Sequence, residues 1–157
     1  MLRDFQANYG KVKNTMFKAA DAMVTGMAVV KNHVNNTVAF PAAATADNLF
    51  LVTKERVPTG INAGRGDMSD YDDNFVKITE DEFVGLEQYV NQGERFGTDQ
   101  YVKDGLAVGD VVMAGTDGKF VKATAGMEST YAYVGEFDDV GHTLAIIEVL
   151  GTPVANA

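Results

Sequence analysis

The stretch that decides the fold runs from Asp110 to Leu150 and reads DVVMAGTDGKFVKATAGMESTYAYVGEFDDVGHTLAIIEVL. It alternates short runs of β-branched and aromatic residues with turn residues, which is typical of strands joined by tight turns. The first turn lies around Asp117-Gly118, a preferred pair for a two-residue hairpin, and the last lies between Asp138 and Gly141. The predicted strands are 110–114, 119–123, 130–137 and 143–150. Short strands at such regular spacing predict a β-sandwich or a barrel.

Alternation along these strands also predicts which side chains share a face. Tyr131, Tyr133 and Phe137 stand at alternating positions, so we expect them on one face of their strand. Only one of Ile146 and Ile147 can face the core, because neighbouring side chains of a strand point in opposite directions.

Upstream of this stretch, the residues from 21 onward also have the texture of β-structure. We expect the body of the protein to be a β-rich unit over 21–150, with a long surface loop near 58–74 that is rich in glycine and aspartate. Residues 82–90 fit a helix or a strand equally well, and residues 151–157 read as a frayed tail of small side chains. The other strands expected in this region are 23–30 and 38–40, joined by an Asn-rich turn, followed by 49–53 and 75–78.

Residues 1–20 differ from the body in charge and are expected to form an N-terminal arm. They hold four basic residues against Asp4 alone, which sums to +3 and leaves −12 for the other 137 residues. Their apolar residues recur at steps of three and four, as on one face of a helix, although Gly10 and Asn14 interrupt that helix. The arm is therefore either a terminal helix packed on its own domain or a segment whose apolar face docks on another subunit. The candidate interface residues are Leu2, Phe5, Tyr9, Val12, Met16 and Phe17.

Composition limits the functions that this chain can have. The 157 residues include no cysteine, which excludes disulfides, thiolate zinc sites, iron–sulfur clusters and thiol nucleophiles. A net charge of −9 argues against a partner that is a nucleic acid. No apolar run approaches the ~20 residues that span a bilayer, so we expect no membrane partner.

Few residues could carry catalysis or bind a cofactor. The histidines are His33 and His142, both in expected turns, and the serines are Ser69 and Ser129, neither in a G-x-S-x-G elbow. No phosphate-binding, dinucleotide-binding or zinc-protease motif occurs. The sequence therefore predicts no enzyme, no catalytic residue and no cofactor.

The sequence also contains a weak match to a metal-binding motif. Asp70, Asp72 and Asn74 imitate the start of a calcium-binding loop, D-x-D-x-N. The match fails where Phe75 replaces the glycine of the sharp turn and Asp81 replaces the terminal glutamate. We therefore expect no metal site.

The C-terminal third resembles the small β-rich capsid decoration (cement) proteins of tailed bacteriophages. In that family a "VGD-V-V" strand is followed by a "G-K-hydrophobic-V-K-A" strand, as in Gly105–Val112 and Gly118–Ala123 here, and then by a "VG" strand and a last apolar strand, as in Val134-Gly135 and Ile146–Leu150. The resemblance covers roughly residues 105–150. Together with the pattern above, it implies a mainly β fold, a small antiparallel barrel or sandwich, with an N-terminal arm for which a partly helical structure is one option.

The resemblance also implies a function. Such a protein is a structural component of the virion that binds the assembled major capsid protein and stabilises the head by bridging neighbouring capsomers. It would be made in the host cytoplasm and reside in the capsid. Self-association, with a trimer as one option, stays open.

Two other functions fit the same residues. The first is a phage tail-tube, head-completion or fibre-base structural protein, which would form rings or tubes alone. The second is a binding module for a ligand or a host surface, centred on the loop at 58–74.

Overall fold

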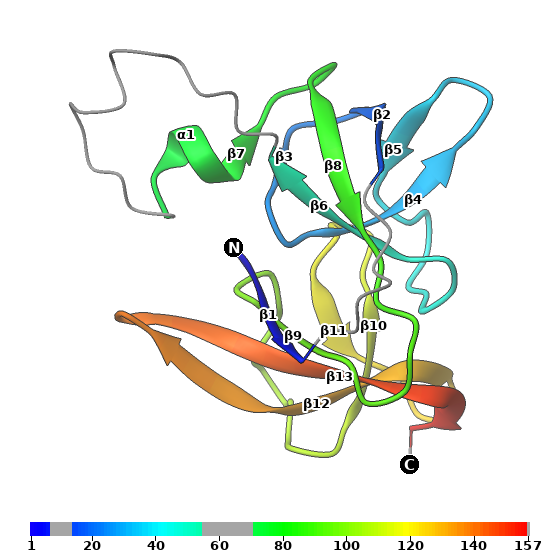
Figure 1. Cartoon of the computed structure of the whole chain (residues 1–157). Coiled ribbons are helices and arrows are strands. Elements are labelled where there is room, and N and C mark those ends of the chain that lie inside the picture. Colours follow the sequence, from blue (N-terminus) through cyan, green and yellow to red (C-terminus); the bar gives the residue numbers. More distant parts are fainter. Residues whose placement is uncertain (7–13, 55–70, 157) are drawn as a thin grey trace.

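The computed structural model describes residues 1–6, 14–54 and 71–156, and these form a mainly β protein, as the sequence predicts. Strands gather in two units, a six-stranded antiparallel sheet and a closed five-stranded barrel that sits over one face of this sheet (Figure 1). A pair of two-residue strands, β3 (Met23–Val24) and β7 (Lys77–Ile78), and one short helix, α1 (Asp73–Val76), lie beside the barrel.

The six-stranded sheet is built around the C-terminal stretch. Its long central hairpin pairs β12 with β13 over most of their length, and β10 and β11 continue the sheet on the β12 side. Its order is β1 (Leu2–Gln6), β9 (Arg95–Thr98), β13 (His142–Ala155), β12 (Glu128–Asp139), β10 (Val111–Ala114) and β11 (Phe120–Lys122).

The barrel collects strands from the first half of the chain. All its neighbours are antiparallel except β2 and β5, which pair in parallel because the chain crosses between them through β3 and β4. Its order is β2 (Asn14–Ala19), β5 (Thr37–Ala39), β4 (Ala28–Asn32), β6 (Phe50–Lys54) and β8 (Phe83–Glu87). The ambiguous segment at 82–90 is therefore strand where it is regular.

Two apolar clusters hold these units together. One fills the barrel and includes Phe17, Val52 and Leu86. The other joins barrel to sheet, where Leu51 and Tyr89 meet the aromatic residues of the sheet face. Two hydrogen bonds cross the same junction. The N–H of Ala28 donates to the carbonyl of Gly118 at 2.8 Å, and the Thr98 hydroxyl donates to the carbonyl of Gly26 at 3.0 Å.

The N-terminal segment departs from the helical option. Residues 2–6 form β1, which pairs with β9, and residues 14–19 form β2, which pairs with β5 and β8. The described residues with apolar spacings of three and four therefore lie in strands and not in a helix. Pairing with distant strands outweighs the local helical periodicity, which Gly10 and Asn14 already weaken. Tyr9 and Val12 lie outside the described residues.

Two predicted strands are interrupted. The strand expected at 23–30 is broken at Gly26, whose φ of 96° ends β3 before β4 begins. Of the strand expected at 75–78, only Lys77–Ile78 is strand, as β7. The two residues before it belong to α1, whose N-terminus is capped by the Asp72 carboxylate, which accepts the N–H of Asn74.

The turn at Asp117-Gly118 is longer than the two-residue turn expected. Gly118 has a φ of 75°, but Asp117 does not have a positive φ, and the N–H of Gly115 donates to the carbonyl of Lys119. This is a three-residue loop in which a glycine follows a type I turn. The two-residue turn with both φ angles positive instead joins β12 to β13, at Val140 (φ 55°) and Gly141 (φ 85°).

The prediction that Tyr131, Tyr133 and Phe137 share a face was wrong. A β-bulge between Tyr133 and Gly135 shifts the register of β12 by one residue. Tyr133 therefore pairs with Ile147 on the core face, while Phe137 pairs with Leu144 on the opposite face. Ile147 is the buried member of the isoleucine pair and Ile146 is half-buried.

The expected tail and loop have different outcomes. Residues 151–155 continue β13 and pair with the start of β12 at Glu128 and Ser129, so this part of the tail is strand. Most of the loop expected at 58–74 lies outside the described residues, and its last two residues, Asp73 and Asn74, already belong to α1.

Candidate functional site

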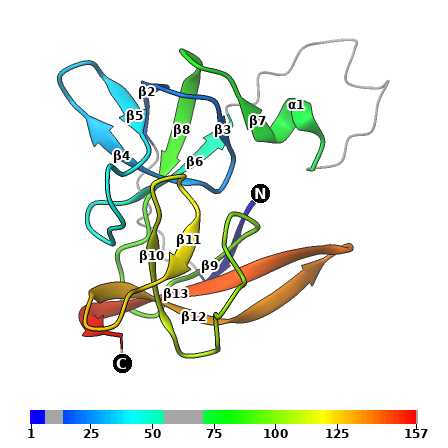
Figure 2. The same cartoon turned by 180° about the vertical axis from the view of Figure 1, so that it is seen from behind.

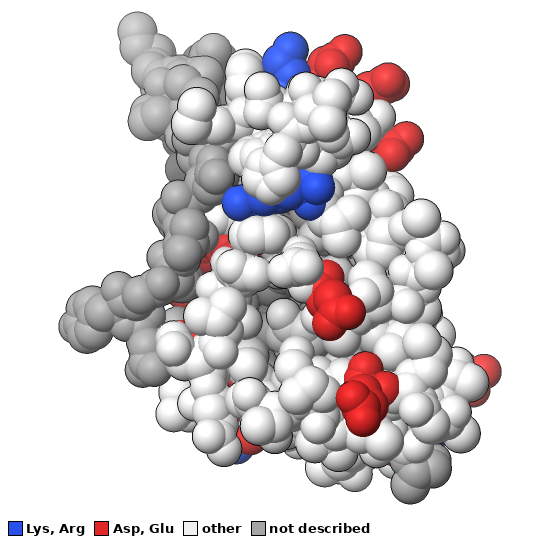
Figure 3. Space-filling view, turned by 90° about the vertical axis from the view of Figure 1, so that its right-hand side faces the viewer, with Lys and Arg blue, Asp and Glu red and all other residues white. Residues whose placement is uncertain are grey.

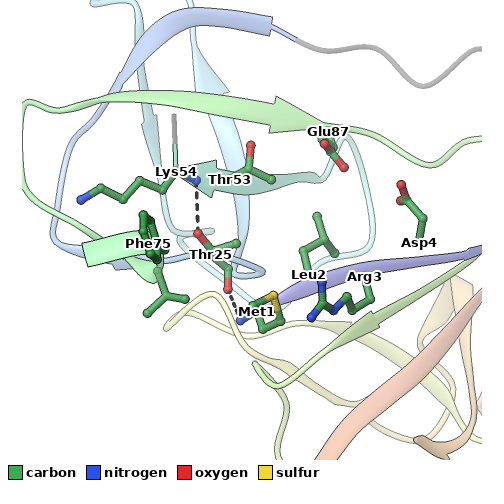
Figure 4. A pocket seen from close by; sticks show the side chains of 10 residues that line it. Met1, Leu2, Arg3, Asp4, Thr25, Thr53, Lys54, Phe75 and Glu87 are labelled. Carbon is green, nitrogen blue, oxygen red and sulfur yellow. Dashed lines mark hydrogen bonds between the residues drawn. The ribbon is translucent and has the colours of Figure 1, made fainter. Parts of the chain in front are cut away.

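A cavity of about 180 Å³ lies where the start of β1 meets the barrel and α1 (Figure 4). The described part of its lining is polar and includes no histidine or serine. Its lining residues are Met1, Leu2, Arg3, Asp4, Thr25, Thr53, Lys54, Phe75, Val76 and Glu87.

The cations around this cavity are all paired. The Met1 ammonium donates to the Thr25 carbonyl at 2.7 Å and lies 2.5 Å from the Asp99 carboxylate. The Arg3 guanidinium donates to Asp139 at 2.8 Å, and the Lys54 ammonium lies 3.3 Å from Glu82. The Met1 contact with Thr25 joins the start of β1 to the barrel side, whereas Arg3–Asp139 links two strands of the sheet and Lys54–Glu82 lies within the barrel unit.

The carboxylates of the cavity are engaged as well. The hydroxyl of Tyr89 donates to Asp4 and lies 3.4 Å from Glu87. Burial, followed by the hydrogen bond to Asp4, raises the pKa of Tyr89 well above its usual range, so this phenol stays protonated. Burial also shifts the pKa of the Met1 ammonium, in this case downward, and the hydrogen bond to Asp99 offsets part of that decrease. The contacts of the described lining residues hold strands and side chains together around the cavity.

The residues that the sequence offers for catalysis are far apart. His33 lies in the turn after β4 with its ring 5.6 Å from that of Phe17, whereas His142 stacks on Tyr71 at 3.6 Å. The Ser129 hydroxyl is buried and donates to the carbonyl of Val112 at 2.5 Å. Ser69 lies outside the described residues. None of the three described side chains is paired with another of them.

The imitation of a calcium loop is also explained by local structure. Asp72 caps α1, and Asp73 pairs with Lys77 at 2.6 Å. Asp70 lies outside the described residues. Within the described parts of the chain, no three histidine or acidic side chains gather as they would around a metal ion.

The interface residues expected in the arm divide into two groups. Phe17 is buried inside the barrel and Leu2 packs against the cluster between barrel and sheet, so both serve the core of this chain. Met16 is 77% exposed on β2, and Phe5 lies on the sheet with its ring 5.1 Å from that of Phe137. Of the described members, Met16 and Phe5 are the ones whose side chains are exposed.

Further apolar side chains are exposed at the two ends of the molecule. At the barrel end, Val34 is 90% exposed in the turn between β4 and β5, and Phe83 on β8 is 55% exposed. At the other end, Val140 is 92% exposed at the tip of the β12–β13 hairpin, and Phe137 is 44% exposed next to it. Figures 1 and 2 show the two hairpins pointing in opposite directions.

The tip of the β12–β13 hairpin is held in a defined position. The Tyr71 hydroxyl donates to Asp139 at 2.7 Å, and Arg3 donates to the same carboxylate oxygen at 2.8 Å. Burial, and then the bond to Asp139, raises the pKa of Tyr71 above its usual range, so the phenol remains a donor up to high pH. The exposed apolar residues of the tip therefore sit on an anchored hairpin.

Sequence reasoning singled out Phe137 as a core or subunit-contact residue but missed Val140 at the tip. It placed a turn at 138–141 but treated Val140 as part of a turn without a role. The available signal was a β-branched residue in a tight turn, where asparagine, aspartate or glycine is usual.

Comparison with known proteins finds no match for this chain, whether among protein-family models, curated proteins or solved structures. No helix within residues 1–6, 14–54 and 71–156 has the length and apolar character needed to cross a membrane.

Proposed function

We propose that this chain is a virion structural protein, a capsid decoration protein that binds the assembled major capsid protein and stabilises the head by bridging neighbouring capsomers. The role needs neither catalysis nor a cofactor, and it places the protein in the capsid after synthesis in the host cytoplasm. The resemblance of residues 105–150 supports it, and this segment forms β10, β11, β12 and most of β13.

The observation that carries the proposal is the pair of apolar surfaces at opposite ends of the molecule. Val34, Met16 and Phe83 mark the barrel end, whereas Val140 and Phe137 mark the hairpin end. A protein that bridges two neighbours needs two separated contact surfaces on a rigid body. The apolar cluster that spans barrel and sheet supplies the rigidity.

The charge distribution supports the same role. The face in Figure 3, which is the right-hand side of Figure 1, has acidic side chains gathered along its upper edge and isolated ones lower down, and wide areas between them are without charge, although the chain has a net charge of −9. Interfaces are depleted of charge at their centres, so such a face suits contact with other subunits.

Bridging also relaxes the affinity that each contact must supply. When one end of the molecule is bound, the second contact forms within the same complex and at a high effective concentration. Each surface then needs only a modest affinity, which a few exposed apolar side chains can provide.

The test mixes the purified protein with undecorated heads of the bacteriophage that encodes it. We expect saturable cosedimentation in the ultracentrifuge and a rise in the temperature at which the heads break open. The variants Val34→Asp and Val140→Asp each alter one end at a fully exposed position. We expect each variant to stabilise heads less than the wild type while its own melting temperature stays within a few degrees of the wild-type value.

Two results would contradict the proposal. Absence of wild-type binding to heads, with rings or tubes formed by the protein alone, would favour a tail or connector protein. If the wild type and both variants stabilise heads equally, the two ends of the molecule are not the surfaces that bridge capsomers.

A further inference from the structure

The outer edge of β12 near the hairpin tip has main-chain groups with no described strand beside them. On this side, β10 pairs with β12 only at Tyr131 and Ala132, and the last contact is made by Tyr133, whose N–H donates to the carbonyl of Asp110 at 2.9 Å. Beyond it β12 continues to Asp139 with β13 as its sole neighbour among the described strands. Figures 1 and 2 show this distal half of the hairpin projecting from the sheet.

The turn determines which main-chain groups point outward. Val140 and Gly141 form a two-residue turn, so Asp139 and His142 close the hairpin as a hydrogen-bonded pair. Pairs along an antiparallel ladder alternate between hydrogen-bonded and non-hydrogen-bonded, so the pair Asp138–Thr143 is of the second kind, as is Glu136–Ala145. The N–H and C=O groups of Glu136 and Asp138 therefore point away from β13, and no described main-chain group bonds to them.

An edge of this kind is a template for another strand. It can extend the sheet by one strand if an extended segment supplies complementary N–H and C=O groups. The side chains around it add contact area, since Phe137 and Val140 are exposed.

The charge of the edge decides between possible occupants. The two outward-facing residues are both acidic and both exposed. Glu136 is already paired within the chain, because the Lys103 ammonium and the Tyr101 hydroxyl donate to its carboxylate at 2.9 Å and 2.7 Å, so the charge that a partner strand would meet is that of Asp138. If two copies of this chain paired edge to edge with Asp138 opposite Asp138 or Glu136, carboxylates would face each other, which is unfavourable. A strand with lysine or arginine opposite Asp138 would instead form a cross-strand pair of opposite charge.

We propose that the outer edge of β12 from Glu136 to Asp138 pairs with an extended, basic segment of the shell protein. This inference rests on the proposed function, because the shell protein is the partner named there. It assigns the main-chain edge as the attachment site at the hairpin end, with Val140 and Phe137 as its apolar border.

The experiment uses variants at two positions that face each other across the hairpin. Asp138→Pro removes the outward N–H of β12, and proline is tolerated where that group faces solvent. Thr143→Pro makes the same change on the opposite edge of the hairpin, since Thr143 is the direct cross-strand neighbour of Asp138. Asp138→Ala keeps the N–H and controls for loss of the carboxylate, which accepts the N–H of Gly141 at 2.8 Å. Asp138→Lys keeps the N–H and reverses the charge.

Affinity for undecorated heads is measured by cosedimentation, and circular dichroism checks the fold of each variant. We expect Asp138→Pro to weaken binding about tenfold through loss of roughly one hydrogen bond, and Asp138→Lys to weaken it about tenfold through repulsion between its ammonium and the basic segment, whereas Asp138→Ala loses only an exposed charge pair. Thr143→Pro and Asp138→Ala should stay within about threefold of the wild type. If Asp138→Pro fails to fold, the comparison of Asp138→Lys with Asp138→Ala still tests the edge.

Other results would overturn the inference. Equal weakening by both proline variants would show dependence on the shape of the hairpin and not on the β12 edge. If Asp138→Pro binds heads as tightly as the wild type, strand pairing at this edge is excluded. If Asp138→Lys binds as tightly as the wild type, a basic occupant is excluded. If the wild type itself does not bind heads, the proposed function fails, and that result is distinct from all of these.

Discussion

At the scale of single residues, Tyr131 shows how burial in this sheet couples protonation to stability. Its ring packs against Phe96 and Phe120 in the cluster between barrel and sheet. Burial raises the pKa of Tyr131 to about 12, because the charged phenolate is poorly solvated there. The folded state therefore holds this proton more tightly than the unfolded state, in which the pKa is about 10.

This difference predicts a loss of stability at alkaline pH. The contribution of Tyr131 to the free energy of unfolding is fully present below pH 10 and is lost as the pH rises toward 12. The loss at pH 12 is about 2 kcal/mol. We expect Tyr131→Phe to lose less stability than the wild type over this range, as measured by urea unfolding at pH 8, 10, 11 and 12. The comparison at pH 8 is the control, since all phenols are protonated there. Parallel profiles for the two proteins would contradict the assignment of Tyr131 as a buried titrating group.

At the scale of elements, the β12–β13 hairpin carries a strained turn. Val140 has a φ of 55°, which a β-branched residue adopts at a cost, whereas asparagine followed by glycine is the preferred pair for this turn. The hairpin tolerates this strain because Tyr71 and Arg3 hold the neighbouring Asp139.

Replacing the strained residue should therefore stabilise the protein. We expect Val140→Asn to raise the free energy of unfolding by about 1 kcal/mol, through relief of backbone strain. The matched control is Val34→Asn, because Val34 is equally exposed in a turn but does not have a positive φ. Thermal unfolding of the two variants measures the difference, and equal shifts would contradict the strain at Val140.

At the scale of the whole molecule, the barrel and the sheet meet at a glycine. Gly118 lies in the loop between β10 and β11, has a φ of 75°, and accepts the N–H of Ala28 from the barrel. A Cβ at this position would lie 2.7 Å from the ring of Phe40 and 3.1 Å from the carbonyl oxygen of Ala28. The close approach of the two units therefore depends on the absence of a side chain.

A methyl group at this glycine should disturb docking of the barrel. We expect Gly118→Ala to lower the free energy of unfolding by roughly 2–4 kcal/mol, which combines backbone strain with overpacking at the junction. Gly126→Ala is the control, because Gly126 also has a positive φ, of 81°, but a Cβ there meets nothing within 4 Å. It should cost only about 1–2 kcal/mol, the strain alone. Equal losses for both variants in calorimetry would contradict the role of Gly118 in docking.

The candidate interface was only partly predictable from the sequence. Of the six apolar residues assigned to the arm, Phe5 and Met16 are exposed, whereas Phe17 and Leu2 pack into the chain's own core. Side-chain exposure depends on which strands pair across long stretches of chain, as β1 does with β9, and a local apolar period does not report this. Val140 was missed because its exposure follows from the projection of the hairpin.

The sequence by itself determined the mainly β class, the hairpins of the C-terminal stretch and their approximate ends, because turn residues and β-branched runs act locally. Only the tertiary structure decided that β12 shifts register at a bulge, which places Phe137 on the face opposite Tyr133. It likewise decided that β10 pairs with β12 only at Tyr131 and Ala132, so that no described strand lies beside the outer edge of the rest of β12 toward the hairpin tip. It also decided that the N-terminal segment forms strands of both units. The physical reason is the same in each case. Strand pairing and side-chain burial are settled by partners far away in the sequence, and their combined free energy exceeds the small local preferences of the residues involved.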